Sequence, residues 1–193
     1  DAPRGYYPRY FQGEQGYWTV VGAGDGDSKE ALFSEDGALE VDRGSFTIEP
    51  FLFTDGHLIT WADVEPAQSL ADDYLPIPTV RWEHQHVWLG ITAFAAGKPG
   101  ESALYARYRV ENLSDETRHV TLFLAVRPFQ VNPPWQSLNM VGGVSPIREL
   151  DYADQIVRVT PAGKQIAVLN APDRFRAASF DQGLLINSLA LGK

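Results

Sequence analysis

The stretch of residues 103–127, ALYARYRVENLSDETRHVTLFLAVR, contains the clearest strand pattern of this chain. Apolar residues recur at every second position in each half, and the polar connection 112–117 separates the halves. Successive side chains of a strand point to opposite faces, so this alternation gives each segment one apolar face. The two apolar faces are formed by Leu104, Ala106, Tyr108 and Val110 and by Val120, Leu122, Leu124 and Val126. The stretch therefore predicts two neighbouring antiparallel strands with one buried side.

The same alternation continues on both sides of this pair, broken by short polar turns. Asp36-Gly37 and Asp55-Gly56 each lie between apolar segments, and Asp-Gly in this context is the strongest local signal of a hairpin. A strand is predicted over 57–64, after the second of these turns. Four shorter strands are predicted near the end of the chain, at 156–159, 166–169, 175–180 and 184–186. No segment of useful length has the period of a helix.

Ten or more strands without helices must pack as two sheets or close into a barrel. A chain of 193 residues is long enough for one well-filled domain of this kind. We therefore predict an all-β fold, a large antiparallel two-sheet sandwich, over residues 17–193, with residues 1–16 as an N-terminal extension or linker. Because the sequence starts at Asp1 without a methionine, inside a patterned segment, we expect a fragment of a longer chain.

The composition narrows the classes of partner. The 25 acidic residues exceed the 16 Lys and Arg, which gives a net charge of −9. Nucleic acids and anionic membranes both need a basic surface, so we expect neither as a partner. The chain has no cysteine, which excludes disulfides and thiolate metal sites but leaves the compartment open.

The segment 22–28, GAGDGDS, is rich in glycine and aspartate. A dinucleotide-binding motif would need a glycine at Asp27 and a following helix, and neither is present. A calcium loop would need a carboxylate or amide where Lys29 stands. We interpret the segment as an acidic surface loop and expect no cofactor.

Two of the four histidines lie in Glu83-His84-Gln85-His86. On a continuous strand His84 and His86 would point the same way and could share a metal ion. However, the flanks 80–82 and 87–91 are both typical of strands, and four polar residues between them form an ordinary hairpin loop. We interpret the segment as a turn that is neither a metal site nor a catalytic site.

The outer face of the predicted strand pair carries aromatic and arginine side chains, and Phe123 is one of the aromatic ones. Aromatic rings stack on the C–H surfaces of sugars, and Arg or Gln bonds sugar hydroxyls. Tyr, Trp and Arg are also the usual anchors of protein interfaces, so both kinds of ligand stay open and a protein partner is favoured. The candidates for these contacts are Tyr105, Arg107, Arg109 and Arg127, with Trp135 and Gln136 in the proline-rich loop 131–146.

Residues 87–128, VWLGITAFAAGKPGESALYARYRVENLSDETRHVTLFLAVRP, resemble a known family. They are similar to the N-terminal β-sandwich of cellobiose-phosphorylase-like enzymes and cyclic β-glucan synthases. In that family, one strand ends in an aromatic residue and small residues. It is followed by a second strand, an Asn-x-Ser-Asp hairpin and a strand of the Leu-Phe-Leu type. The same supersandwich, similar to the galactose mutarotase fold, precedes the (α/α)6 barrel of glucoamylase-like and maltose-phosphorylase-like enzymes.

The resemblance implies that the catalytic acid lies in an (α/α)6 barrel of the same polypeptide, against which the sandwich packs. It also implies that the sandwich can mediate a homodimer and lend a loop to the rim of the active site. Galactose mutarotases use a His and a Glu on this fold, but neither His84 nor His86 matches a motif of theirs. We therefore expect a non-catalytic module of a larger bacterial carbohydrate-active enzyme with an oligo- or polysaccharide substrate. The alternatives are a mutarotase-like sugar epimerase and a free-standing carbohydrate-binding module.

Overall fold

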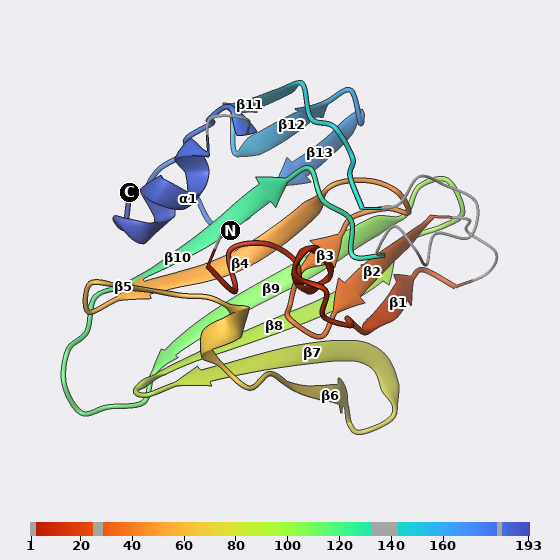
Figure 1. Cartoon of the computed structure of the whole chain (residues 1–193). Coiled ribbons are helices and arrows are strands. Elements are labelled where there is room, and N and C mark those ends of the chain that lie inside the picture. The colour runs from red at the N-terminus through yellow and green to blue at the C-terminus, as the bar shows by residue number, and fades with distance from the viewer. Residues whose placement is uncertain (1–2, 25–28, 133–142, 181–182) are drawn as a thin grey trace.

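The computed structural model describes residues 3–24, 29–132, 143–180 and 183–193 (Figure 1). Within these ranges the chain forms thirteen strands, and all strand pairs are antiparallel. Helical structure is confined to two 3-10 turns and one short α-helix in the same ranges. The prediction of an all-β antiparallel fold is confirmed.

The strands form three sheets. Sheet A has the order β1 (Trp18–Gly22), β2 (Glu30–Ser34), β3 (Leu39–Glu40), β4 (Thr47–Thr54) and β10 (Val120–Arg127), and β5 (His57–Ile59) also pairs with β4. Sheet B has the order β6 (Ala67–Ala71), β7 (Leu75–His84), β8 (Val87–Ala96) and β9 (Ala103–Asn112). Sheet C consists of β11 (Glu149–Ala153), β12 (Ile156–Thr160) and β13 (Lys164–Ala167). The helical elements are η1 (Arg9–Gln12), η2 (Trp61–Asp63) and α1 (Leu184–Ala190).

The main hydrophobic core lies between sheets A and B. Leu39 and Leu52 of sheet A and Trp82, Leu89 and Ile91 of sheet B belong to one buried cluster, and each is at most 1% exposed. These residues alternate with solvent-facing ones along β7 and β8, as expected when only one face of a sheet is covered. The two sheets therefore pack as a β-sandwich (Figure 1).

The strands 103–112 and 120–127 do not pair with each other, so that part of the prediction is wrong. β9 pairs with β8, whereas β10 pairs with β4 in the other sheet. Leu104 and Val110 of β9 nevertheless pack against the same core as Val120 and Leu122 of β10. The two apolar faces thus meet across the core, because the connection between them crosses from one layer to the other (Figure 1).

Sheet A is covered on both faces. Ile48 and Leu52 lie on one face of β4, where Ile48 contacts Val157 of sheet C and Leu52 contacts sheet B. On the opposite face, Phe51 packs against Leu189 of α1. Sheets B and C therefore cover different parts of one face, and α1 covers part of the other.

The helix α1 occupies the segment in which the sequence pattern predicts the strand 184–186, so this prediction is wrong. Leu185, Ile186 and Leu189 lie on the side of α1 that packs on sheet A. A helix of 7 residues is too short to be stable alone, so its packing on the sheet determines its conformation. The predicted strand 175–180 is absent as well. The strand predicted over 57–64 stops at Ile59, because Thr60 begins η2 with a capping box.

The segment before β1 packs onto the sandwich. Tyr10 is 7% exposed, and its hydroxyl lies 2.9 Å from the carbonyl oxygen of Gln130 and 2.8 Å from that of Gly143. The indole N–H of Trp61 donates to the carbonyl oxygen of Tyr7 at 3.1 Å. Residues 3–16 thereby join η2 to the chain that follows β10.

Candidate functional site

The outer face of sheet B combines aromatic, arginine and threonine side chains from three adjacent strands. In the row at Gly90 of β8, Arg81 of β7 lies on one side and Arg109 of β9 on the other. Two residues further along β8, Thr92 lies between Thr79 and Arg107, and two further again Phe94 is opposite Tyr105. We call these rows, with Trp88 and its cross-strand neighbours Glu83 and Glu111, the ladder face.

Trp88 is held between two guanidinium groups on the ladder face. The Cζ atoms of Arg81 and Arg109 lie 5.6 and 5.8 Å from the centroid of its ring, within the range of a cation–π interaction. The ring leans along β8 over Gly90, where an added Cβ would come within 2.3 Å of Cη2 of Trp88. A glycine inside a strand marks such a close approach, and here it gives the indole its space.

Each of these two arginines also pairs with a glutamate on its own strand. Nη2 of Arg81 lies 2.9 Å from Oε2 of Glu83, and Arg109 contacts Glu111 in the same way. The four side chains are between 37% and 63% exposed, so solvent screens both pairs and they add little stability. Their effect is to place hydrogen-bond donors and acceptors side by side at the surface.

The far end of the ladder face is aromatic. The rings of Phe94 and Tyr105 stack with centroids 5.0 Å apart and an interplanar angle of 10°. They remain 37% and 44% exposed. Between this pair and Trp88, the hydroxyls of Thr79 and Thr92 form a hydrogen bond of 2.8 Å. The face thus offers two aromatic rows separated by a polar one.

Three of the six residues predicted as contact candidates lie on the ladder face. Tyr105, Arg107 and Arg109 project from one side of β9, and all three are exposed. Trp135 and Gln136 lie outside the described residues.

Arg127 is not on the surface, and its predicted exposure is wrong. It is 1% exposed, and Nη1 donates to the carbonyl oxygen of Tyr6 at 2.8 Å. Nε lies 3.5 Å from Oε1 of Glu49, and the Cζ atom is 4.6 Å from the ring centroid of Phe129. The face of β10 that holds Arg127 is covered because the N-terminal segment folds over it. Phe123, on the same face, is half-buried beside α1.

The sequence contains a signal for the residues that were not predicted. Trp88, Gly90, Thr92 and Phe94 recur at every second position of β8, on the face opposite the buried residues. Their importance depends on their neighbours, because Arg81 and Arg109 meet Trp88 only once β7, β8 and β9 are in register. The predicted pairing of 103–112 with 120–127 concealed this arrangement.

The histidines of Glu83-His84-Gln85-His86 form a hairpin end, as predicted. β7 ends at His84, β8 begins at Val87, and Gln85 has the positive φ of 51° that such a tight turn requires. The turn is shorter than expected, since Glu83 and His84 belong to the strand. No group of three or more His, Asp or Glu side chains that could hold a metal ion occurs within the described ranges. Residues 25–28 of the glycine-rich segment lie outside those ranges.

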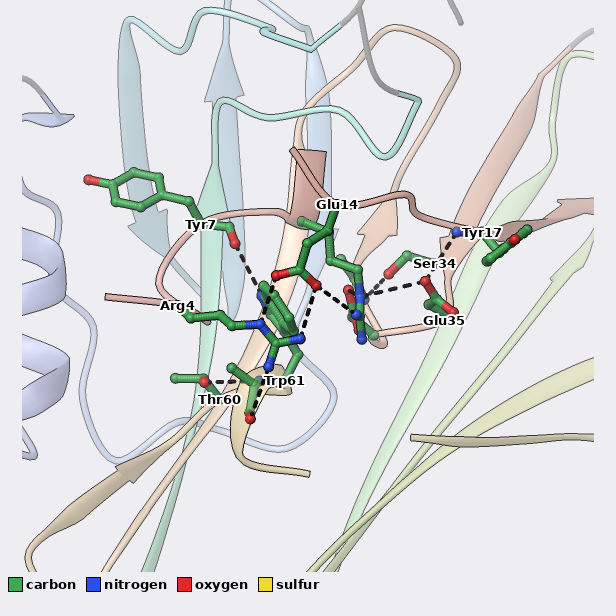
Figure 2. Close-up of polar contacts among 12 residues, drawn as sticks. Arg4, Tyr7, Glu14, Tyr17, Ser34, Glu35, Thr60 and Trp61 are labelled. Carbon is green, nitrogen blue, oxygen red and sulfur yellow. Dashed lines mark hydrogen bonds and ion pairs between the residues drawn. The ribbon is translucent and has the colours of Figure 1, made fainter. Parts of the chain in front are cut away.

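A second polar cluster joins the N-terminal segment to the turn between β2 and β3 (Figure 2). Nη2 of Arg9 lies 2.7 Å from Oδ1 of Asp36, and Nε of Arg4 lies 2.7 Å from Oε1 of Glu14. The Cζ atoms of Arg4 and Arg9 are 4.7 and 4.4 Å from the ring centroid of Trp61. These contacts fix residues 4–14 against η2 and sheet A.

Among the groups of this cluster, the carboxyl of Asp36 has the largest shift in pKa. Burial raises the pKa of Asp36 to about 6, the Arg9 guanidinium opposes this rise, and the carboxylates of Glu35 and Glu14 add to it. The folded pKa is thus above the unfolded value near 3.8. The folded state therefore binds the proton more tightly, and stability falls as the pH rises from about 4 to 6.

The Asp36→Asn variant tests this direction. The free energy of unfolding of the wild type, minus that of the variant, should fall by about 1.5 kcal/mol between pH 5 and pH 8. Urea denaturation followed by circular dichroism at a series of pH values measures the difference. A difference that stays constant over this range would mean that Arg9 keeps the pKa of Asp36 near its ordinary value.

Comparison with known proteins gives no relative from which a function could be transferred. No protein family, no curated protein and no solved structure matches the chain. No helix in the described part of the chain is long and apolar enough to span a membrane.

Proposed function

We propose that this chain is a non-catalytic β-sandwich module of a larger carbohydrate-active enzyme, and that the ladder face contacts neutral carbohydrate. The architecture in this proposal is the galactose-mutarotase-like supersandwich, and the catalytic residues belong to an (α/α)6 barrel of the same polypeptide. The observation that carries the proposal is the position of Trp88 between Arg81 and Arg109, where stacking orders two guanidinium groups at an open surface.

The end of the ladder face around Trp88 is chemically suited to bind hydroxyl groups. A hydroxyl both donates and accepts hydrogen bonds, and each Arg–Glu pair of the ladder face presents a donor next to an acceptor. The two arginines and two glutamates balance in charge, so this end of the ladder face favours a neutral ligand over an acidic one. Guanidinium groups that are already ordered by Trp88 lose less conformational freedom on binding.

The loop 131–146 is the proposed means by which the module shapes the entrance of the substrate. Its two described ends are held by buried polar side chains. Oε1 of Gln130 accepts from the backbone N–H of Gly143 at 2.8 Å, and Oε2 of Glu40 accepts from that of Val131 at 2.7 Å. Burial raises the pKa of Glu40, against the opposing effect of these backbone donors. The two described ends of this segment are thus held at defined places on the sandwich.

Titration of the purified chain with neutral β-linked gluco-oligosaccharides tests the proposal. We expect saturable binding in isothermal calorimetry with a Kd of about 1 mM, and no turnover of the sugars. An oligogalacturonide of the same length should bind more weakly, since both arginines are already paired with glutamates and the chain has a net charge of −9. Absence of binding to every neutral sugar would contradict the proposal.

Steady hydrolysis or phosphorolysis by the chain alone would contradict the proposal, and anomerisation would favour the epimerase alternative instead. His84→Ala and His86→Ala variants in a polarimetric assay would then identify the catalytic histidine. Sugar binding by the chain without a catalytic barrel in the same polypeptide would favour the free-standing carbohydrate-binding module.

A further inference from the structure

We infer that the ligand of the ladder face is an oligosaccharide that lies along β8, from Trp88 to the Phe94–Tyr105 pair, and not a single sugar. This inference rests on the proposed function and names the length and direction of its ligand. Antiparallel strands rise about 3.4 Å per residue, so Gly90, which the indole covers, and Phe94 are about 14 Å apart. A single pyranose ring is much shorter than this separation. Contact with both aromatic rows therefore needs several linked sugars.

The row between the two aromatic rows is suited to the middle of such a ligand. The Thr79 and Thr92 hydroxyls bond each other and keep lone pairs for a further donor. Arg107, next to Thr92 across the strands, is exposed and has no hydrogen bond or ion pair with any described residue. Its five N–H donors are thus free to bond sugar hydroxyls between the aromatic ends.

Gly90 is the positioning residue of the site. It is buried although it faces outward, because the Trp88 ring covers it. Its φ does not lie in the left-handed region, so the backbone accepts an alanine and the close contact is with the indole. Gly90→Ala therefore displaces Trp88 from between Arg81 and Arg109 without removing any of the side chains that bind the ligand.

The test compares ligands of increasing length. Glucose and β-1,3- and β-1,4-linked gluco-oligosaccharides of two to six units are titrated into the wild type by calorimetry. Affinity should rise with length until the ligand spans the face, and then stay constant. Trp88→Ala should weaken binding of every length about tenfold, and Gly90→Ala should do the same. Tyr105→Ala should weaken only the longer ligands, by a similar factor.

Tyr17→Ala is the matched control, since Tyr17 is 60% exposed and directly precedes β1 of sheet A, the layer opposite the ladder face. It should leave all affinities unchanged. Unfolding midpoints of all variants confirm that each is folded.

The experiment distinguishes a failure of the proposed function from a failure of the inference about ligand length. If no sugar of any length binds, the proposed function itself is wrong. If sugars bind, but glucose binds as tightly as the hexasaccharide or Trp88→Ala and Gly90→Ala leave affinity unchanged, the inference is overturned while the proposed function stands. Equal effects of Tyr105→Ala on short and long ligands would also overturn it, since the two aromatic rows would then form one subsite.

Discussion

Replacing Arg127 with methionine should lower the free energy of unfolding by about 3–5 kcal/mol, because it leaves a buried carboxylate without its charge partner. Glu49 is 6% exposed, its Oε1 lies 3.5 Å from Nε of Arg127, and it accepts a hydrogen bond of 2.7 Å from the hydroxyl of Thr47. Arg127 also donates to the carbonyl oxygen of Tyr6, so its removal loosens the N-terminal segment. Urea denaturation followed by circular dichroism at neutral pH measures the change.

A double variant separates the charge from the packing. Glu49→Gln combined with Arg127→Met removes both charges, and it should be more stable than Arg127→Met alone. Replacing a buried ion pair by groups of similar volume is often close to neutral, whereas removing one partner is costly. If the double variant is as unstable as the sum of the two single variants, the pair is not coupled, and the loss comes from packing against Phe129 and its neighbours.

Replacing Trp82 with alanine should cost about 3–5 kcal/mol of unfolding free energy, because the largest side chain between the sheets is lost and a cavity forms. Trp82 is 1% exposed and belongs to the core shared by sheets A and B. The midpoint of urea denaturation should fall accordingly, and the near-ultraviolet circular dichroism of the core should change.

Trp88→Ala is the matched control, because Trp88 lies in the adjacent strand and on the opposite face of the same sheet. Its removal should change the unfolding free energy by about 1 kcal/mol or less, as expected of a partly exposed side chain. Similar losses for both tryptophans would contradict a sandwich in which only the inner face of sheet B is buried. The two variants thus distinguish a tryptophan that stabilises the fold from one that belongs to the ladder face.

The alternation of residues along a single strand was enough to predict the two faces of β9. Tyr105, Arg107 and Arg109 were placed on the outer side of β9, and Leu104, Tyr108 and Val110 on its inner side, as the structure has them. The turn was predicted over 83–86 from the polar residues between two strand-like flanks, and the structure has it at Gln85-His86. Side-chain direction in a strand and the conformation of a tight turn depend on a few consecutive residues, which a sequence shows directly.

The pairing of strands and the burial of individual side chains could not be predicted in this way. The apolar faces of 103–112 and 120–127 are compatible with two neighbouring strands and also with strands in opposite layers. Arg127 follows the polar pattern of an outer face, yet the N-terminal segment buries it, more than a hundred residues away in sequence. The segment of α1 has apolar residues that suit a strand as well as a helix, and contact with Phe51 selects the helix.

The sequence by itself determined that this protein is built from antiparallel strands, which side of β9 faces the core, and that the histidine pair ends a hairpin. Only the tertiary structure decided which strands are neighbours, and with that the stack of Arg81, Trp88 and Arg109 and the burial of Arg127. The physical reason is the range of the interactions. Periodicity and turn conformation are local properties of the chain, whereas a cross-strand stack or a buried ion pair exists only after segments distant in sequence have come into register.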